Sequence, residues 1–479
     1  MNRPAGRGRA KVARVDEVLW KAAAKLRGSV DAARYKDFVL GLVFLKYVSD
    51  KHMSDKHISD RALPVPAGAR WADLAAASGP GTLGERIDAA MDTIMRADPS
   101  LDGVLPKIFA GVDQRRLGDL VELIGQVEFG GRSARDVLGE VYEYFLERFA
   151  RAEGKRGGEF YTPSSVVKLL VEILEPFKGR VYDPCCGSGG MFVQAERFVL
   201  SHRGRLDDIA VYGQEANERT WRLARMNLAV HEIAGDIRLA DTFVEDAHPG
   251  IEADHVLANP PFNMSDWYRD AGDPRWRYGV PPAGNANFAW MQHILAKLGP
   301  HGRAGVVMAN GSMSSRQSGE GEIRAAIVEA DLVSCVVALP DRLFRSTQIP
   351  ACLWFLDRNK DTPGRVLFID ARDMGTMVDR TERVLTGDDI ARIAGAYRSW
   401  RAHDHSDVPG FCRSADVDEI RSHDHVLTPG RYVGTAEPDP GGEPAADRVE
   451  RLTKELLTHF EESARLDQIV RAELGRLDG

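Results

Sequence analysis

The stretch "VYDPCCGSGGMF", residues 181–192, joins an apolar strand pattern to a helix pattern through a loop with three glycines. The glycines let the backbone turn tightly and come close to a bound ligand. Phe192 occupies the third glycine position of the dinucleotide pattern G-x-G-x-x-G, and the loop lacks the Lys-Ser or Lys-Thr pair that binds phosphate. The loop therefore favours a ligand without phosphate that carries a carboxylate and an ammonium group. Taken alone, however, the glycines also fit an ordinary strand–helix turn.

Outward from this loop, strand patterns alternate with helix patterns along the chain. Stretches such as "GGMFVQAERFVLSH" (189–202) and "NERTWRLARMNLAVHEI" (217–233) have apolar residues at helical spacing. This alternation predicts right-handed crossovers and a mostly parallel, doubly wound α/β sheet. The expected strands are Arg180–Asp183, Ile209–Gly213, Asp236–Leu239, Asp254–Ala258, Ala304–Met308 and Leu332–Leu339, with the runs 352–356 and 365–370 extending the sheet.

Acidic residues stand at the carboxyl ends of the first three expected strands. Asp183 can accept a hydrogen bond from an ammonium group, and Glu215 stands where α/β folds bind ribose hydroxyls. Asp241, in "LADTF" (239–243), can accept from the amino group of an adenine ring. Taken singly, Glu215 also fits a solvated glutamate at a strand end, and Asp241 also fits a helix N-cap or turn.

The fourth expected strand stops abruptly at the corner Asn259-Pro260-Pro261-Phe262. The Asn259 side-chain oxygen and the Pro260 carbonyl are acceptors for the two N–H groups of an amino group conjugated to a ring. Such bonds favour a pyramidal nitrogen whose lone pair is aimed at an electrophile, and Phe262 offers a face on which a flat base can stack. A loop punctuated by prolines is the alternative, but it does not explain the position at a carboxyl strand end. The corner alone leaves amino groups of adenine, cytosine and glutamine side chains open as targets.

Composition sets limits on the class of protein. The chain has 479 residues, more than one core usually supports, and its 43% hydrophobic and 28% charged residues are typical of a soluble globular protein. A net charge of -8 is unusual for a protein that grips nucleic acid alone, so such contact would need local patches or a partner chain. Five cysteines do not suggest a disulfide framework, and Cys185 and Cys186 lack the second ligand pair of a metal site. We expect a cytoplasmic protein, without metal, in which these two cysteines are small buried residues.

The sequence predicts four parts. Residues 1–14 form a disordered basic arm, residues 15–151 a helical domain, residues 152–440 the α/β domain and residues 441–479 an amphipathic helix. Within the helical domain, "FVLGLVFLKYV" (38–48) is too short to span a bilayer and is expected to be a buried core helix. The final helix, Pro444 to Leu474, either folds back on its own domain or docks on another protein; its apolar positions at helical spacing are Val449, Leu452, Leu456, Phe460, Val470 and Leu474.

In combination these motifs resemble a known family. "DPCCGSGGM" (183–191) followed by "NPPF" (259–262) resembles the class I S-adenosylmethionine-dependent amino-methyltransferases, which have a Rossmann-like sheet. Three further stretches narrow the resemblance to the methylation subunits of type I restriction-modification systems, the HsdM family. They are "LWKAAAKLRGSVDAARYKDFVLGLVFLKYVSDKH" (19–52), "GEFYTPSSVVKLL" (158–170) and "LTPGRYVG" (427–434), and they occur in the family's order.

The resemblance implies a site-specific, adenine-specific DNA methyltransferase that transfers a methyl group from S-adenosylmethionine to N6 of adenine in double-stranded DNA. It implies a methyltransferase domain over residues 152–440, preceded by an all-helical domain, and direct in-line transfer. It also implies partners: two methylation subunits assemble with one DNA specificity subunit, and a restriction subunit can join them. The final helix then becomes the expected dock for the partner. The loop 266–279, which mixes arginines with aromatic residues, either contacts DNA around the flipped base or is a plain surface loop.

The resemblance also assigns roles to residues of this sequence. Asn259, Pro260, Pro261 and Phe262 are expected to hold the target adenine, flipped out of the duplex. Asp183, Ser188, Gly189 and Gly190 are expected to hold the methionine part of the cofactor, Glu215 its ribose, and Asp241 to lie near its adenine ring. The residues expected to line the cofactor pocket besides these are Glu159, Phe160, Tyr161, Thr162, Pro163 and Ser164.

Overall fold

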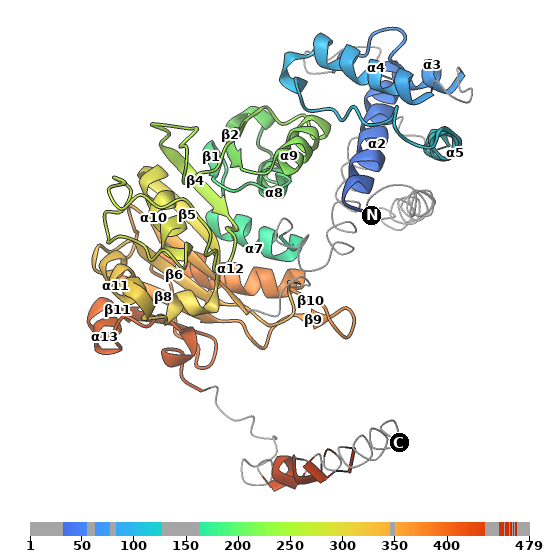
Figure 1. The fold of residues 1–479 in the computed structure, drawn as a ribbon. Coiled ribbons are helices and arrows are strands. Elements are labelled where there is room, and N and C mark those ends of the chain that lie inside the picture. The colour runs from blue at the N-terminus through green and yellow to red at the C-terminus, as the bar shows by residue number, and fades with distance from the viewer. Residues whose placement is uncertain are drawn as a thin grey trace, which may run out of the picture. The chain divides into compact units, whose positions relative to one another are not determined.

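The computed structural model describes residues 32–54, 63–76, 83–126, 162–344 and 350–435, and most of 450–466 (Figure 1). The chain divides into two compact units, Met1–Gly434 and Thr435–Gly479. The predicted basic arm and the helix patterns at 15–28 and 134–150 lie outside the described residues.

The first described part is helical. Its helices are α2 (Ala32–Ser54), α3 (Trp71–Ala76), α4 (Leu83–Ala97) and α5 (Gln114–Gly125). Residues 38–48 lie in the middle of α2 and are buried throughout, which confirms the prediction of a core helix. Among the residues that the structure describes, no helix is long and apolar enough to cross a membrane.

The second part is built on a nine-stranded sheet with the order β11-β8-β6-β7-β5-β4-β1-β2-β3. Each predicted strand is present, with boundaries that differ by a few residues except for a longer β5. The strands are β1 (Gly179–Asp183), β2 (Ile209–Glu215), β3 (Gly235–Leu239), β4 (Ala253–Ala258), β5 (Leu298–Ala309), β6 (Val333–Ala338), β7 (Ala351–Asp357), β8 (Arg365–Asp370) and β11 (Cys412–Asp416).

Strand direction is mixed, although parallel pairings predominate. The pairings β1–β2, β2–β3, β1–β4, β4–β5 and β6–β8 are parallel. By contrast, β7 pairs antiparallel with both β5 and β6, and β11 pairs antiparallel with β8. Residues 358–364, which join β7 to β8, are too few for a helical crossover, so the chain must reverse direction there. The prediction of a mostly parallel sheet therefore holds, with β7 as a reversed strand inside it.

Helices cover both faces of the sheet, as a doubly wound fold requires (Figure 1). Because side chains alternate along a strand, Val181 of β1 packs in one hydrophobic cluster and Tyr182 in the cluster on the opposite face. The first cluster includes residues of α7 (Ser164–Leu174), α8 (Gly190–Ser201), α9 (Glu218–Val230) and α12 (Gly387–Arg401). The second includes residues of α10 (Asn287–Lys297), α11 (Glu320–Glu329) and α13 (Val417–Ser422).

Beyond Thr435, the second unit is described only between residues 450 and 466, where the described residues are helical. Leu452, Leu456 and Phe460 follow one another at intervals of four residues and are 47%, 52% and 61% exposed. These positions agree with the predicted amphipathic helix, whose other apolar positions, Val449, Val470 and Leu474, lie outside the described residues.

Candidate active site

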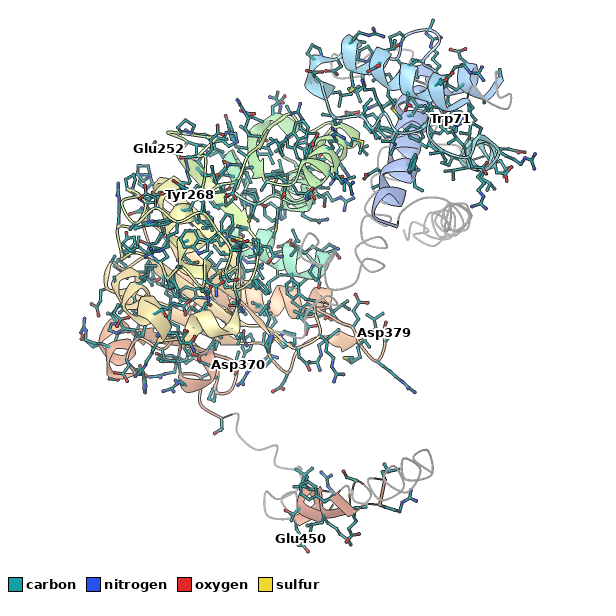
Figure 2. The ribbon with its side chains drawn as sticks, viewed as in Figure 1. Trp71, Glu252, Tyr268, Asp370, Asp379 and Glu450 are labelled. Atoms are coloured by element: carbon teal, nitrogen blue, oxygen red, sulfur yellow. The ribbon has the colours of Figure 1, made fainter. Side chains whose placement is uncertain are left out.

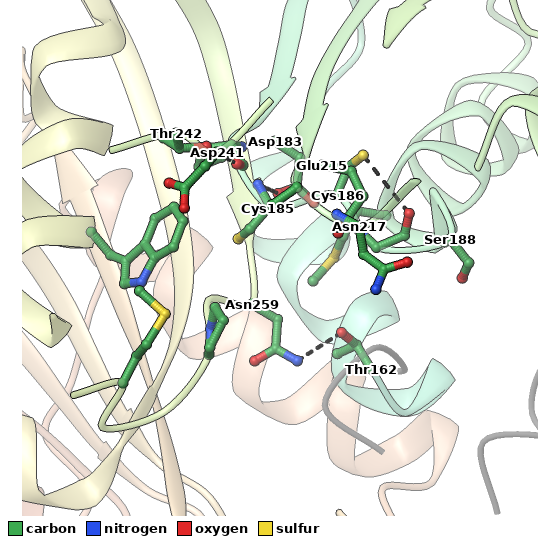
Figure 3. A pocket seen from close by; sticks show the side chains of 18 of the residues that line it. Thr162, Asp183, Cys185, Cys186, Ser188, Glu215, Asn217, Asp241, Thr242 and Asn259 are labelled. Atoms are coloured by element: carbon green, nitrogen blue, oxygen red, sulfur yellow. Dashed lines mark hydrogen bonds between the residues drawn. The ribbon is translucent and has the colours of Figure 1, made fainter. Parts of the chain in front are cut away.

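A cavity of about 200 Å³ lies at the carboxyl ends of the central strands (Figure 3). Its wall is formed by the ends of β1 and β2, the corner and loop after β4, the glycine loop that opens α8, the turn after β3, the start of α7 with Thr162 before it, and one side chain of α10. Parallel strands bring their carboxyl ends to the same edge, and this is why residues far apart in the sequence meet here. The predicted site residues in this wall are Thr162, Asp183, Ser188, Gly190, Glu215, Asp241, Asn259 and Pro261.

The glycine loop is held in place by the two acidic residues that end β1 and β2. One carboxylate oxygen of Asp183 accepts a hydrogen bond from the Cys185 N–H at 3.0 Å. The two oxygens of Glu215 accept from the N–H of Gly187 at 3.1 Å and of Asn217 at 2.8 Å. Glu215 thus joins the loop after β1 to the loop after β2, a role that the sequence did not reveal.

Two residues of the loop have structural roles beside the cavity. Gly189 has φ 78°, and a Cβ atom there would lie 2.9 Å from a side-chain carbon of Leu228 in α9. The positive φ and the close approach of α9 favour glycine at this position, and Gly189 is not among the residues of the cavity wall. The Ser188 carbonyl accepts a hydrogen bond at 2.9 Å from the amide of Asn227, which is fully buried. Packing of α8 against α9 therefore fixes the loop.

The cavity contains two buried carboxyl groups and, among the described residues of its wall, neither lysine nor arginine. Burial raises the pKa of Asp183 to about 7; the Cys185 hydrogen bonds oppose this rise and the Glu215 charge adds to it. Burial also raises the pKa of Glu215, although the N–H groups of Asn217 and Gly187 oppose the rise. A cation bound beside these groups would favour their ionised forms. The cavity therefore suits a positively charged ligand better than a phosphate.

Donor and acceptor groups line the end of the cavity that contains Asp241. One Asp241 oxygen accepts from the Phe243 N–H at 2.9 Å, and the Thr242 hydroxyl donates to the Pro184 carbonyl at 2.6 Å. Trp290 of α10 also belongs to this wall, and its buried indole N–H has no hydrogen-bond partner in the structure. An adenine ring carries an amino donor and several ring-nitrogen acceptors, so Asp241 and Trp290 supply complementary groups.

The corner after β4 presents an unpaired acceptor. The Asn259 amide nitrogen donates to the Thr162 hydroxyl oxygen at 2.9 Å, and Figure 3 shows the amide oxygen on the opposite side, away from Thr162. That oxygen is buried and has no hydrogen-bond partner in the structure. A buried acceptor without a partner costs about 1–3 kcal/mol, a cost that a bound donor would remove. The corner is therefore arranged to receive an N–H group.

Other contacts fix the residues around the corner. Phe262 is half-buried, and its ring centroid lies 6.0 Å from that of Phe344 at an interplanar angle of 66°. Asn263, at φ 53°, and Asn287 of α10 exchange two hydrogen bonds of 3.0 and 2.9 Å. Pro260 is buried, and neither Pro260 nor Phe262 belongs to the wall of this cavity. The two residues lie beside Pro261 and Asn259, which do.

Other predicted residues lie elsewhere. Glu159, Phe160 and Tyr161 are outside the described residues, while Pro163 is the N-cap of α7, Ser164 is its first residue, and neither is in the cavity wall. Cys186 is buried as predicted. Cys185 is partly exposed instead, and both cysteines line the cavity.

The loop 266–279 combines both interpretations of its sequence. Trp276 is 8% exposed and packs with Phe243 and Trp290. Arg275 is also mostly buried, with its side chain 13% exposed. Tyr268, labelled in Figure 2, is 56% exposed, and Arg277 is exposed as well. The packed aromatic residues agree with a structured surface loop. Because the Arg275 side chain is mostly buried, it is not available to contact DNA.

Sequence reasoning missed several residues of the site. Trp290 lies in "FAWMQHIL" (288–295), where every apolar residue is equally consistent with helix packing. Thr242, Met264 and Asn217 line the cavity as neighbours of predicted residues. Asn217 carried a usable signal, because an asparagine directly before a helix pattern predicts an N-cap, and its side chain does cap α9.

Comparison with known proteins agrees with the sequence motifs. The model of the N-6 DNA methylase family matches residues 133–439, and that of the HsdM N-terminal domain matches residues 15–124. The chain is 49% identical to the methylase subunit of the type I restriction enzyme HindI from Haemophilus influenzae, over 82% of this chain and 92% of that protein. It is 36% identical to the MjaIX methylase subunit from Methanocaldococcus jannaschii, over 96% and 90% of the two chains.

A solved structure shows the same fold. The crystal structure of a type I restriction-modification methyltransferase subunit from Streptococcus thermophilus has a TM-score of 0.76 and 26% identity, and the match covers 88% of this chain and 99% of that one. The chain belongs to the N-6 DNA methylases and, among them, to the methylation subunits of type I restriction-modification systems, adenine-specific DNA methyltransferases that use S-adenosylmethionine.

Proposed function

We propose that the cavity holds S-adenosylmethionine and that Asn259 presents the N6 amino group of a flipped adenine to it. The observation that carries the proposal is the pair of buried carboxyl groups, Asp183 and Glu215, in a wall whose described residues include no basic side chain. When bound, S-adenosylmethionine supplies an electrophilic methyl carbon on a positively charged sulfur; the amino nitrogen bonds to this carbon in line as the carbon–sulfur bond breaks, S-adenosylhomocysteine is the leaving group, and N6 then releases one proton to water. Its sulfonium and ammonium charges suit this wall.

The cofactor contacts follow from the groups around the cavity. Asp183 accepts from the ammonium group, and the N-terminus of α8 attracts the carboxylate. Glu215 accepts from the ribose hydroxyls with the lone pairs left over from its bonds to the loops. Asp241 accepts from the amino group of the cofactor's adenine ring, and Trp290 donates to one of its ring nitrogens. Each of these roles uses a donor or acceptor group that is still available after the hydrogen bonds within the protein are formed.

The target adenine is held by acceptors. The Asn259 amide oxygen and the Pro260 carbonyl accept the two N–H groups of N6, and Pro260 has no N–H of its own to compete. Phe262 provides the stacking face, and its contact with Phe344 holds the ring in place. Thr162 accepts from the Asn259 amide nitrogen, which leaves the amide oxygen for the base. With the nitrogen fixed in this way, positioning supplies most of the rate.

DNA specificity and strong DNA binding are proposed to come from a partner. The chain carries a net charge of -8, which favours basic groups of a partner chain over this chain alone as the source of strong DNA binding. The exposed row Leu452, Leu456 and Phe460 has the spacing of a helix face that docks in a groove. We propose that this row joins the chain to a DNA specificity subunit, with two methylation subunits per specificity subunit, and that a restriction subunit can join the assembly.

The reaction is tested by nucleoside analysis, which identifies the modified base, and by methylation-sensitive sequencing, which locates it, on DNA treated with the chain, its specificity subunit and S-adenosylmethionine. The proposal requires N6-methyladenine at one sequence motif. N4-methylcytosine in its place, or methylated DNA without any dependence on Asn259, would refute the assignment of the corner to adenine.

Replacing Glu215 with glutamine is expected to raise the dissociation constant for S-adenosylhomocysteine about tenfold or more. Glutamine has one oxygen, so it loses an acceptor for Gly187 or Asn217 and weakens the ribose site as well. Isothermal titration of the purified chain measures the effect. Glu218→Gln, on an exposed side chain three residues further on, is the matched control and should bind as the wild type does. Equal affinity in all three proteins would remove Glu215 from the site.

The isolated chain is expected to bind DNA weakly and without sequence preference.

The Leu456→Asp variant is expected not to co-purify with the specificity subunit, because the substitution places a charge in the exposed apolar row. Thr458→Asp adds the same charge on the other side of the helix and should leave the complex intact. Size-exclusion chromatography and an electrophoretic mobility assay measure both effects. Tight, selective DNA binding by the chain alone would contradict the dependence on a partner.

A further inference from the structure

The loop that follows the Asn259 corner returns to the cofactor side of the cavity. Met264, near its start, lines the cavity, and its carbonyl accepts from the Ala286 N–H at 2.9 Å, which closes the base of the loop. Arg275 lies in the middle of this loop. Its sequence context, between aromatic residues, suggested a side chain that reaches toward DNA, but the structure directs the guanidinium group inward.

The guanidinium group of Arg275 holds the two residues that directly follow Asp241. One terminal nitrogen donates to the Thr242 carbonyl at 2.7 Å, and the other lies 3.3 Å from the Phe243 carbonyl. Asp273 orients the group from its own loop, because its two oxygens accept from the Arg275 Nε at 2.9 and 2.8 Å. One fork therefore bonds both the loop and the turn that carries Asp241.

The same guanidinium group reaches β1 through His293. It lies 3.0 Å from the Nδ1 atom of His293, whose Nε2 atom lies 3.1 Å from the Tyr182 hydroxyl. An arginine can only donate, so Nδ1 must be the acceptor, and Nε2 carries the hydrogen and donates to Tyr182. His293 is fully buried, and burial, with Arg275 and Lys297 nearby, holds its pKa well below the usual value, as a neutral ring requires. Tyr182 directly precedes Asp183 in β1.

These bonds are shielded from water. The side chains of Arg275 and Asp273 are each 13% exposed. The guanidinium carbon lies 5.8 Å from the ring centre of Phe243 and 5.3 Å from that of Trp276. Phe243 in turn lies 4.4 Å, centre to centre, from Trp290 of the cavity wall. Shielded charge-assisted bonds are stronger than exposed ones, so this connection is rigid.

We propose that Arg275 is a positioning residue that sets the turn carrying Asp241 against β1 and the target-base loop. In this arrangement only the segment Asp273–Trp276 of the loop supports the cofactor's binding site, and through it the cofactor side and the base side of the cavity form one unit. The inference rests on the proposed function of the cavity. It also separates Arg275 from Arg277, which is exposed and two residues away in the same loop.

The test compares Arg275→Lys with Arg277→Gln in the purified full chain, by isothermal titration with S-adenosylhomocysteine. Lysine keeps the charge but lacks the fork, so it cannot hold Thr242, Phe243 and His293 together. We expect its dissociation constant to rise about tenfold or more, and that of Arg277→Gln to stay within about twofold of the wild type. The change in tryptophan fluorescence on cofactor binding should differ from that of the wild type in Arg275→Lys and match it in Arg277→Gln. Trp276 and Trp290 adjoin the turn, so a displaced turn alters their surroundings.

The controls separate the possible failures. A thermal melt shows whether Arg275→Lys is folded at the temperature of the titration; if it is not, Asp273→Asn, which keeps the shape of the side chain, replaces it with the same expectation. A folded variant with lowered melting temperature and wild-type affinity would overturn the inference, as would equal losses in Arg275→Lys and Arg277→Gln. Failure of the wild-type chain itself to bind S-adenosylhomocysteine would instead refute the proposed function.

Discussion

Replacing Asn259 with alanine is expected to lower the rate of methyl transfer about a thousandfold, while the affinity for S-adenosylhomocysteine stays within about twofold of the wild type. The substitution removes the unpaired amide oxygen, which we propose as the acceptor for the amino nitrogen, and leaves the carboxyl groups of the cavity wall in place. Single-turnover methylation with the specificity subunit present gives the rate, and isothermal titration gives the affinity.

Two further variants show that the amide oxygen is responsible. Asn259→Asp keeps an acceptor but loses the N–H that bonds to Thr162, so it should retain more activity than alanine and less than asparagine. Asn359→Ala makes the original substitution at an exposed position after β7 and should have wild-type kinetics. Wild-type rates in Asn259→Ala would contradict the assignment. A matching loss of cofactor affinity would show that Asn259 serves the cofactor instead.

The fold was predictable to the extent that it is encoded locally. Strands buried on both faces appear as short apolar runs, and helices that cover them show apolar residues at helical spacing, so "VYD" before the glycines and "VLA" before Asn259 mark strands by themselves. The direction of a strand within the sheet, by contrast, is not encoded in the residues of that strand. The apolar run at Ala351–Asp357 has the composition of any central strand, and its reversal between β5 and β6 depends on short connections and on partners elsewhere in the chain.

The same distinction applies to the site. That Asp183, Glu215, Asp241 and Asn259 line one cavity was predictable, because each stands at a carboxyl strand end, a position that the strand pattern itself reveals. Arg275 was not, because its contacts to Thr242 and Phe243 bridge more than thirty residues of sequence. An arginine flanked by aromatics has the same local pattern whether it binds a phosphate or a buried carbonyl. Only the packing of the loop decides between them.

The Asp183→Asn variant is expected to stabilise the free protein at pH 8 and to abolish most of its affinity for the cofactor. Burial raises the pKa of Asp183 from 3.8 to about 7. The pKa of Asp183 is higher in the folded state than in the unfolded state. Its contribution to the free energy of unfolding is therefore fully present below about pH 4 and is lost as the pH rises to about 7. At pH 8 the ionised, buried carboxylate then destabilises the free protein by about 4 kcal/mol at most. Asparagine removes that charge and keeps an oxygen for the Cys185 N–H.

Cofactor binding should depend on pH in the opposite sense, because only the ionised carboxylate pairs with an ammonium group. The wild-type dissociation constant for S-adenosylhomocysteine should rise up to about tenfold per unit as the pH falls below about 7, whereas that of Asp183→Asn should be high and nearly constant. Titrations between about pH 5.5 and 8.5, with thermal melts of the free proteins, measure both effects. Asp266→Asn, at an exposed loop position, is the control. If the wild-type affinity did not depend on pH, Asp183 would not be the residue that binds the ammonium group. If Asp183→Asn were less stable than the wild type at pH 8, the ionised carboxylate would be stabilised by other groups in the free protein. The two measurements together distinguish a carboxylate kept for the ligand from one that holds the fold.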